Sequence, residues 1–281
     1  MNTTGDKTVV PRSIRTILSE LAYRGEVICS RLQGIAYDRP ARNGEYLLVR
    51  RTADSLKLAL DIGANVGDWT AEVVRATRCG ARVLAVDADA DNARILRERF
   101  AQQNNVMVIE AAVTARNGSV NFVSGLNPGS GNGYVTVGDP GGRASRVVAR
   151  TLQDIVAELG DPPIDLVKCD VEGAELDVLT GAEELFERRR IALMQVEYNA
   201  TWMRTGRSLR DLFVFARRYD YHLLIATPFG FSHLPAYGIG LEDYRLRNII
   251  MARPDSVDRL RPYGPAGRAR VEHKRREFVD V

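Results

Sequence analysis

Two glycines follow the first apolar run of the sequence at a spacing that leaves room for a ligand. The run Leu58–Thr70 reads LALDIGANVGDWT and places Gly63 and Gly67 in a turn between a predicted strand and a predicted helix. A glycine at such a turn removes a side chain where a ligand or the helix has to come close. A dinucleotide enzyme would use GxGxxG here, whereas Asn65 stands where its second glycine belongs. The turn therefore favours a ligand without a pyrophosphate.

An acid at the end of the second predicted strand favours S-adenosylmethionine as that ligand. This cofactor carries no phosphate, and the turn can hold its aminocarboxylate while Asp87 accepts hydrogen bonds from both ribose hydroxyls. The alternative for Asp87 is a solvated acid at a strand end. Glu110 and Ala111 follow the third strand, where we expect the adenine. The expected cofactor site comprises Asp61, Gly63, Asn65, Gly67, Asp87, Glu110, Ala111 and Asp170.

Acids end four of the predicted strands, at Asp61, Asp87, Asp170 and Glu197. In an open α/β sheet the ligand lies beyond the carboxyl ends of the strands, so these four side chains should share one rim. Methyl transfer from a sulfonium to an oxygen needs the acceptor oxygen close, aligned and losing its proton. We expect Asp170 to accept that proton and Glu197 to bind a substrate hydroxyl.

His233 is the second candidate for the proton. It lies in the segment FSHLPAYG, a predicted loop between the last two strands on the same rim, and its ordinary pKa suits a base. His222 falls inside the preceding strand and is expected to be a core residue.

Three residues near Asp170 keep two interpretations each. Glu172 and Glu175 either cap the helix that follows or act in the site, with capping favoured for Glu175. Lys168 faces either the site or a surface, depending on how the strand alternates, and Cys169 is expected to be buried. Asp170 and Glu197 are only two acids, so we expect no metal, with a magnesium ion held by their oxygens as the minor alternative.

The elements that must position these residues alternate along the chain. The pattern predicts strands at 57–61, 82–87, 106–111, 164–170, 191–197, 221–226 and 248–252, with helices at 69–77, 90–103, 151–159, 174–188 and 209–218. Such alternation predicts a doubly wound α/β fold. A final connection without a helix predicts an antiparallel last pair. We therefore expect a Rossmann-like, seven-stranded, mostly parallel sheet with an antiparallel last strand.

The segment 117–149 interrupts this alternation. A short strand at 120–123 precedes a glycine-rich stretch at 125–142, for which we expect a loop or an irregular hairpin. The stretch lacks the Gly-Lys-Ser/Thr ending of a phosphate-binding loop.

The flanks divide the chain into an N-terminal helical extension at 1–56, the cofactor-binding domain at 57–252 and a basic tail at 253–281. Residues 11–33 have helical apolar spacing, which fits a helix at a membrane surface or, as we favour, a helix covering one edge of the core. The tail is rich in Pro, Gly and Arg and is expected to pack loosely.

Composition places the chain among ordinary globular proteins, with 45% hydrophobic and 27% charged residues. The net charge is only +3 and arginines are scattered among acids, which argues against a nucleic-acid binder. No run approaches the ~20 apolar residues of a membrane span, and residues 1–7 do not resemble an export signal. The three cysteines form no CxxC pair, so we expect a reducing, cytoplasmic setting.

Three motifs resemble the FkbM family of methyltransferases. They are Asp61–Thr70 (DIGANVGDWT), Thr151–Ile155 (TLQDI) and Ile164–Ala182 (IDLVKCDVEGAELDVLTGA), and the resemblance spans roughly residues 55–250. It implies a class I methyltransferase fold and methyl transfer from S-adenosylmethionine to a hydroxyl oxygen. The family usually has Glu-Pro after its second strand, where this chain has Asp87-Ala88, which keeps the carboxylate.

The resemblance specifies the donor more closely than the acceptor, for which we expect a small-molecule hydroxyl on a sugar, a glycolipid or a polyketide-type secondary metabolite. The alternatives are an N-methyltransferase, a nicotinamide-dependent oxidoreductase and a cofactor-binding module without catalysis. Asn65 argues against the oxidoreductase and Asp170 against the inert module. A homo-oligomer is left open.

Overall fold

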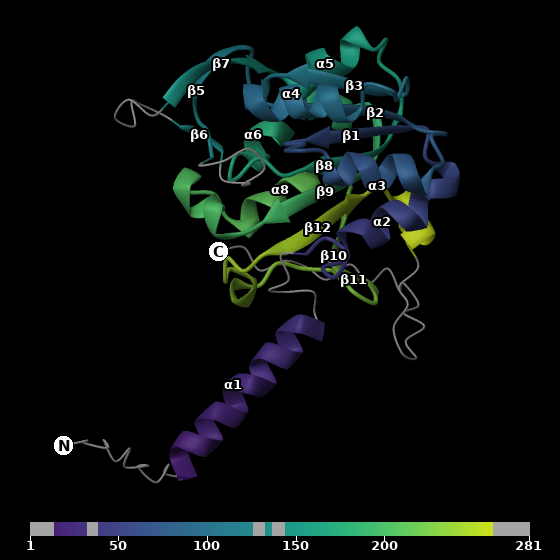
Figure 1. Cartoon of the computed structure of the whole chain (residues 1–281). Coiled ribbons are helices and arrows are strands. Elements are labelled where there is room, and N and C mark those ends of the chain that lie inside the picture. The colour runs from purple at the N-terminus through teal and green to yellow at the C-terminus, as the bar shows by residue number, and fades with distance from the viewer. Residues whose placement is uncertain (1–13, 33–38, 126–132, 137–143, 261–281) are drawn as a thin grey trace, which may run out of the picture.

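An eight-stranded sheet forms the centre of the computed structural model, which describes residues 14–32, 39–125, 133–136 and 144–260 (Figure 1). The strand order is β11-β10-β12-β9-β8-β1-β2-β3. The strands are β1 (Leu58–Ile62), β2 (Arg82–Asp87), β3 (Val106–Glu110), β8 (Ile164–Cys169), β9 (Ile191–Tyr198), β10 (His222–Thr227), β11 (Gly230–Leu234) and β12 (Arg247–Ala252).

The pairing confirms the predicted α/β class. Strands β3, β2, β1, β8 and β9 pair in parallel, and β12 runs antiparallel to both β9 and β10. The predicted count of seven strands was too low by one. The segment that the sequence assigned to a loop begins with Gly230–Leu234, which forms β11 against the free edge of β10. Its GFSHL sequence lacks the apolar run by which buried strands are recognised.

Helices cover both faces of this sheet. Leu60 and Ile62 of β1 point into a core formed with α5 (Leu152–Glu158), α6 (Glu175–Thr180), α7 (Glu183–Glu187) and α8 (Leu209–Arg218), whereas Ala59 points into a core formed with α2 (Glu45–Thr52) and α3 (Asp68–Ala76). Helix α4 (Ala90–Arg99) packs beside α3 through Leu96. Such alternation between two buried faces is expected for a parallel sheet covered on both sides.

A second, small sheet lies mostly in the segment 117–149. The sequence predicted one strand there, at 120–123, followed by a loop or an irregular hairpin, and the predicted strand is confirmed as part of β5 (Gly118–Val123). The sheet also contains β4 (Ala112–Val113), β6 (Tyr134–Thr136) and β7 (Ala144–Arg150), in the order β4-β7-β5-β6. Because β4 follows β3 after one residue, this small sheet starts at the edge of the large one. Most of the glycine-rich stretch, at 126–132 and 137–143, lies outside the described residues.

The packed core includes segments on both sides of the predicted range 57–252. Leu48 and Val49 of α2 are fully buried, and α2 contacts α3 and β10. A 3-10 helix, η1 (Ala53–Ser55), links α2 to β1. At the other end, α9 (Pro254–Val257) and η4 (Asp258–Leu260) close the described chain, with Leu260 fully buried. The predicted tail beyond 260 lies outside the described residues.

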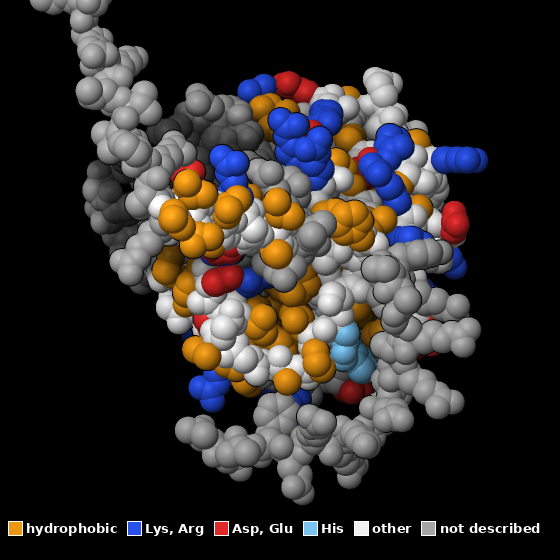
Figure 2. Space-filling view, turned by 90° about the horizontal axis from the view of Figure 1, so that it is seen from below, with side chains coloured by type: hydrophobic (Ala, Val, Ile, Leu, Met, Phe, Trp, Pro, Cys, Tyr) orange, Lys and Arg blue, Asp and Glu red, His pale blue; other side chains and the backbone are white. Residues whose placement is uncertain are grey.

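Helix α1 (Ile14–Leu32) extends from the core instead of covering one of its edges (Figure 1). Arg245 attaches it through its polar side, with nitrogen–oxygen distances of 2.6 Å to Glu26 and 3.2 Å to Ser30. Leu18 and Leu21 stay exposed. Figure 2 shows hydrophobic side chains gathered on the face seen from below. Within the described ranges, no helix is both long and apolar enough to cross a membrane.

Candidate functional site

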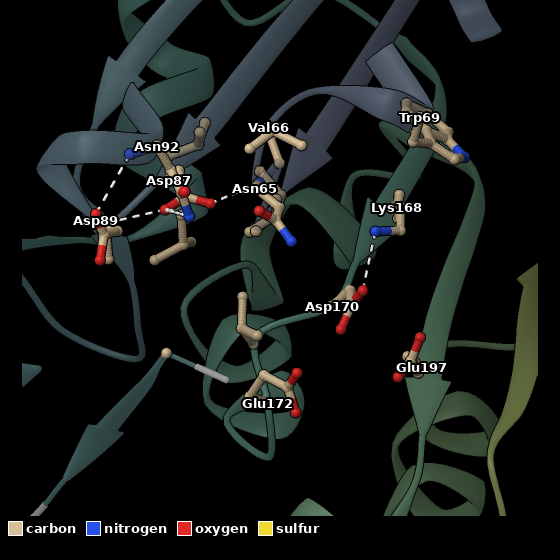
Figure 3. Close-up of a pocket in the computed structure, with 18 of the residues that line it drawn as sticks. Asn65, Val66, Trp69, Asp87, Asp89, Asn92, Lys168, Asp170, Glu172 and Glu197 are labelled. Carbon is tan, nitrogen blue, oxygen red and sulfur yellow. Dashed lines mark hydrogen bonds and ion pairs between the residues drawn. The ribbon is translucent and has the colours of Figure 1, made fainter. Parts of the chain in front are cut away.

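A cavity lies at the carboxyl ends of β1, β2, β8 and β9, where the sequence predicted the ligand. Figure 3 shows Asn65 and Asp87 on one side of it and Asp170, Glu172 and Glu197 on the other. Two further elements complete the wall. The segment before and at the start of α2 contributes Asn43, Glu45 and Tyr46, and the small sheet contributes Phe122 and Val135.

Both glycines of this turn lie so close to other residues of the chain that a side chain would collide with them. Gly63 has φ +78°, and a Cβ there would lie 1.8 Å from the carbonyl oxygen of Asp170, so no other residue fits. Gly67 has φ +87°, and a Cβ there would lie 2.6 Å from the ring of Phe100. Asn65 also has a left-handed backbone, with φ +52°. The turn after β1 therefore packs directly against the end of β8 at the cavity.

Asp87 connects this turn to the start of α4. Its carboxylate accepts hydrogen bonds from the backbone N–H groups of Asn65 (2.6 Å) and Asp89 (2.9 Å) and from the side-chain amide of Asn92 (3.3 Å). Burial raises the pKa of Asp87 to about 6, although these hydrogen bonds oppose the rise. Asp87 lines the cavity.

Three predicted cofactor residues do not line the cavity, namely Gly67, which packs against Phe100, and the two acids Asp61 and Glu110. Asp61 is fully buried below the turn. Its Oδ2 accepts two hydrogen bonds from Thr70, one from the backbone N–H (3.1 Å) and one from the side-chain hydroxyl (2.7 Å). Burial raises the pKa of Asp61. Glu110 is exposed and pairs with Arg97 at 3.0 Å, because its side chain leaves β3 on the solvent side. The neighbouring Ala111 does line the cavity.

Lys168 is a buried cation at the cavity wall, not a surface residue. Its Nζ lies 3.0 Å from Oδ2 of Asp170 and 3.9 Å from Oε1 of Glu45. Burial alone would lower the pKa of Lys168, but Asp170, Glu45, Asp61 and Glu197 raise it well above its usual value. Burial raises the pKa of Glu45 to about 7, against the effect of Lys168.

Glu172 and Glu197 both line the cavity close to Asp170. Burial, followed by the charge of Asp170, raises the pKa of Glu172 to about 7 and that of Glu197 well above its usual value. Oε1 of Glu197 accepts a hydrogen bond of 2.7 Å from the amide of Asn199. Three carboxylates therefore face one space.

The other residues of this segment have structural surroundings. The carboxylate of Glu175 accepts hydrogen bonds from the backbone N–H groups of Val171 (2.9 Å) and Gly173 (3.0 Å) and does not line the cavity. Burial raises the pKa of Glu175 to about 8. Cys169 is fully buried, which confirms the prediction for it.

His233 does not reach the cavity, and its predicted place in a rim loop was wrong. It lies in β11 opposite Leu224, toward the end of β10 remote from the rim. Its Nε2 lies 3.3 Å from Nδ1 of His222, and the histidine side chains lie together at the surface (Figure 2). Burial and His222 lower the pKa of His233. The error follows from the unrecognised strand.

The sequence reasoning missed the contribution of α2. Glu45 and its neighbours were assigned to an extension, although Gly44 before the helix has φ +90° and its backbone packs against Thr227. The turn-forming residues Asn43-Gly44 before an apolar helix were the available signal. In the part of the chain that the structure describes, no group of three or more His, Cys, Asp or Glu residues could hold a metal ion.

Comparison with known proteins gives a family and one curated relative. The family model described as the methyltransferase FkbM domain matches residues 61–223. The 2-O-methyltransferase NoeI of Sinorhizobium fredii is 28% identical over 149 residues, which cover 47% of this chain and 59% of NoeI. The chain therefore matches less than two thirds of that relative's length.

Solved structures similar to this chain include a methyltransferase FkbM from Methylobacillus flagellatus KT. It shows 18% identity and a TM-score of 0.46 over 83% of this chain and 60% of that one. TrmK of M. capricolum, solved with S-adenosyl-homocysteine, shows 12% identity and a TM-score of 0.39 over 74% of this chain and 68% of that one.

Proposed function

This chain belongs to the methyltransferase FkbM family, and we propose that it transfers a methyl group from S-adenosylmethionine to a hydroxyl oxygen of a small molecule. The observation that carries the proposal is the cavity itself. A glycine turn and a ribose-type acid lie on one side of it, and a group of carboxylates lies on the other. We propose a sugar, a glycolipid or a polyketide-type metabolite as the acceptor.

The cavity residues fit this donor. Gly63 and Asn65 line the cavity with left-handed backbone, and Asp87 beside them has carboxylate oxygens that can accept hydrogen bonds from a ribose. Trp69 lines the same wall, and its indole Nε1 is buried without a hydrogen-bond partner among the described residues. The excess of carboxylates around Lys168 suits a donor whose sulfonium and ammonium groups are cationic.

On the acceptor side, we propose that Asp170 and Glu197 face the hydroxyl that is methylated. The bound donor supplies a methyl group activated by its sulfonium, and the residues of the chain have to align the acceptor oxygen with it. Lys168 fixes Oδ2 of Asp170, and Asn199 fixes Oε1 of Glu197, so both carboxylates are held in place. The name of the curated relative, a 2-O-methyltransferase, supports oxygen as the acceptor atom.

The first test of the proposal measures binding of the methyl donor. Asp87→Asn should weaken S-adenosylmethionine binding about tenfold, or ~1.4 kcal/mol, because an amide replaces a carboxylate acceptor of two hydroxyl groups. Isothermal titration calorimetry measures this, with the exposed Asp91→Asn as the matched control. Unchanged affinity in Asp87→Asn, or tighter binding of NAD than of S-adenosylmethionine, would contradict the assignment.

The acceptor is tested with labelled S-adenosylmethionine and a panel of hydroxylated and amino compounds, read by mass spectrometry. We expect label on oxygen in a hydroxylated member of the panel. Label on nitrogen alone would make the protein an N-methyltransferase. Cofactor binding with no transfer to any member would favour a binding module without catalysis.

A further inference from the structure

We propose that Glu172 is the residue that receives the proton lost by the acceptor hydroxyl. This inference rests on the proposed methyl transfer and assigns a catalytic role to a side chain that no comparison assigns. Glu172 lies between β8 and α6, and its carboxylate faces the space that Asp170 and Glu197 also face (Figure 3).

The backbone at Glu172 is held in a conformation that side chains rarely adopt. Its φ is +55°, which costs a residue with a Cβ of the order of 1 kcal/mol or more. The neighbours enforce it, because the carboxylate of Glu175 accepts hydrogen bonds from Val171 and Gly173 on either side. The hydroxyl of Thr205 donates a further hydrogen bond of 2.8 Å to the carbonyl of Gly173. This segment therefore fixes the direction of the Glu172 side chain, as proton transfer during an aligned methyl transfer requires.

The three cavity carboxylates differ in how far they are already engaged. Asp170 accepts a hydrogen bond of 3.0 Å from the buried ammonium of Lys168, and Glu197 accepts one from Asn199. Within the described part of the chain, the carboxylate of Glu172 has no hydrogen bond or ion pair at all. Glu172 is thus the one of the three with both oxygens available to a substrate.

The charges around Glu172 suit a base that works near neutral pH. Asp170 and Lys168 face it from the end of β8, and Arg204 faces it from η2 (Ala200–Thr205). Burial and Asp170 raise its pKa to about 7 against the opposing effects of Arg204 and Lys168. Arg204 is itself held 4.4 Å above the ring of Tyr134 in β6. A base with a pKa near the working pH is the most effective proton acceptor.

The step balances without a further reactant. As the carbon–oxygen bond forms, the carbon–sulfur bond breaks and its electron pair goes to sulfur. The hydroxyl proton passes to the carboxylate of Glu172, which releases it to solvent after the product leaves.

The experiment is the pH dependence of kcat/KM in the full chain. Wild type should gain activity as pH rises, with a midpoint near 7, because the base has to lose its own proton first. Glu172→Gln should lower kcat roughly 100-fold and abolish that rise, while its affinity for S-adenosylmethionine by calorimetry stays unchanged. Glu172→Asp should keep the rise at an intermediate rate. Glu98→Gln, an exposed change on α4, is the matched control and should behave as wild type.

The variant Asp170→Asn tests the competing assignment, in which Asp170 receives the proton. Retention of kcat and of the pH-dependent rise in Glu172→Gln, with loss of both in Asp170→Asn, would assign the proton to Asp170 and overturn the inference. If wild type neither binds S-adenosylmethionine nor methylates an acceptor, the proposed function itself fails and the inference fails with it. The wild-type measurement therefore reports on the function and the variants report on Glu172.

Discussion

Lys168 is a buried cation, and the carboxylates of Glu45, Asp61, Asp170 and Glu197 lie around it. Neighbouring carboxylates resist ionisation together, because each negative charge raises the pKa of the next. A bound cation therefore has two effects here, since it is attracted to the acids and it makes their ionised forms more stable. This charge balance supports the proposed cationic donor.

Gly63 offers a test of how closely the two ends of the site are packed. Gly63→Ala should cost more than about 3 kcal/mol and abolish cofactor binding, because its Cβ would lie 1.8 Å from the carbonyl oxygen of Asp170. Gly160→Ala is the matched control, since Gly160 has a similar φ of +84° with open space around it. That variant should lose only about 1 kcal/mol to backbone strain. Urea denaturation measures both, and equal losses would show that the contact with Asp170 is not decisive.

Helices and strands were predicted correctly where the signal lay within one short segment of the sequence. The strands around Leu60 and Val167 were found within a residue or two, because strands buried on both faces read as continuous apolar runs. Strand β11 and the strands that pair with β5 in the small sheet were missed because their sequences mix polar, glycine and apolar residues. Asp87 and Asp170 were predicted as site residues because each ends a predicted strand. Glu45 was not, because its contact with Lys168 joins positions far apart in the chain.

Helices α1 and α2 were both assigned to one extension, yet they should differ in their contribution to stability. Leu48 of α2 is fully buried, so Leu48→Ala should lower the free energy of unfolding by about 2–5 kcal/mol. Leu21 of α1 is 58% exposed, so the same substitution there should change it by less than about 0.5 kcal/mol. Denaturant titration of both variants checks this. A large loss in Leu21→Ala would show that the apolar side of α1 is covered in solution.

The whole molecule concentrates carboxyl groups with raised pKa values around one cavity. Burial brings the pKa of Asp87 to about 6, of Glu45 and Glu172 to about 7, and of Glu175 to about 8. A group whose pKa is higher in the folded state stabilises the fold fully below its unfolded pKa. That contribution is lost as the pH rises through the folded value. For these groups the loss falls between about pH 5 and 8.

The free energy of unfolding should therefore decrease from pH 5.5 to pH 8.5. Glu175→Gln should reduce this decrease, because the amide retains an acceptor oxygen for the loop and cannot ionise. S-adenosylmethionine should stabilise the protein more at pH 8.5 than at pH 5.5, because the carboxylates of Asp87 and Glu45 on the donor side are ionised to a larger extent at the higher pH. Because Glu175 lies outside the cavity wall, Glu175→Gln should leave that cofactor increment unchanged. Chemical denaturation of the wild type and of Glu175→Gln at both pH values, with and without the cofactor, measures these free energies of unfolding. A stability that increases with pH, or a cofactor increment equal at both pH values, would show that the cavity acids are not the groups that link stability to binding.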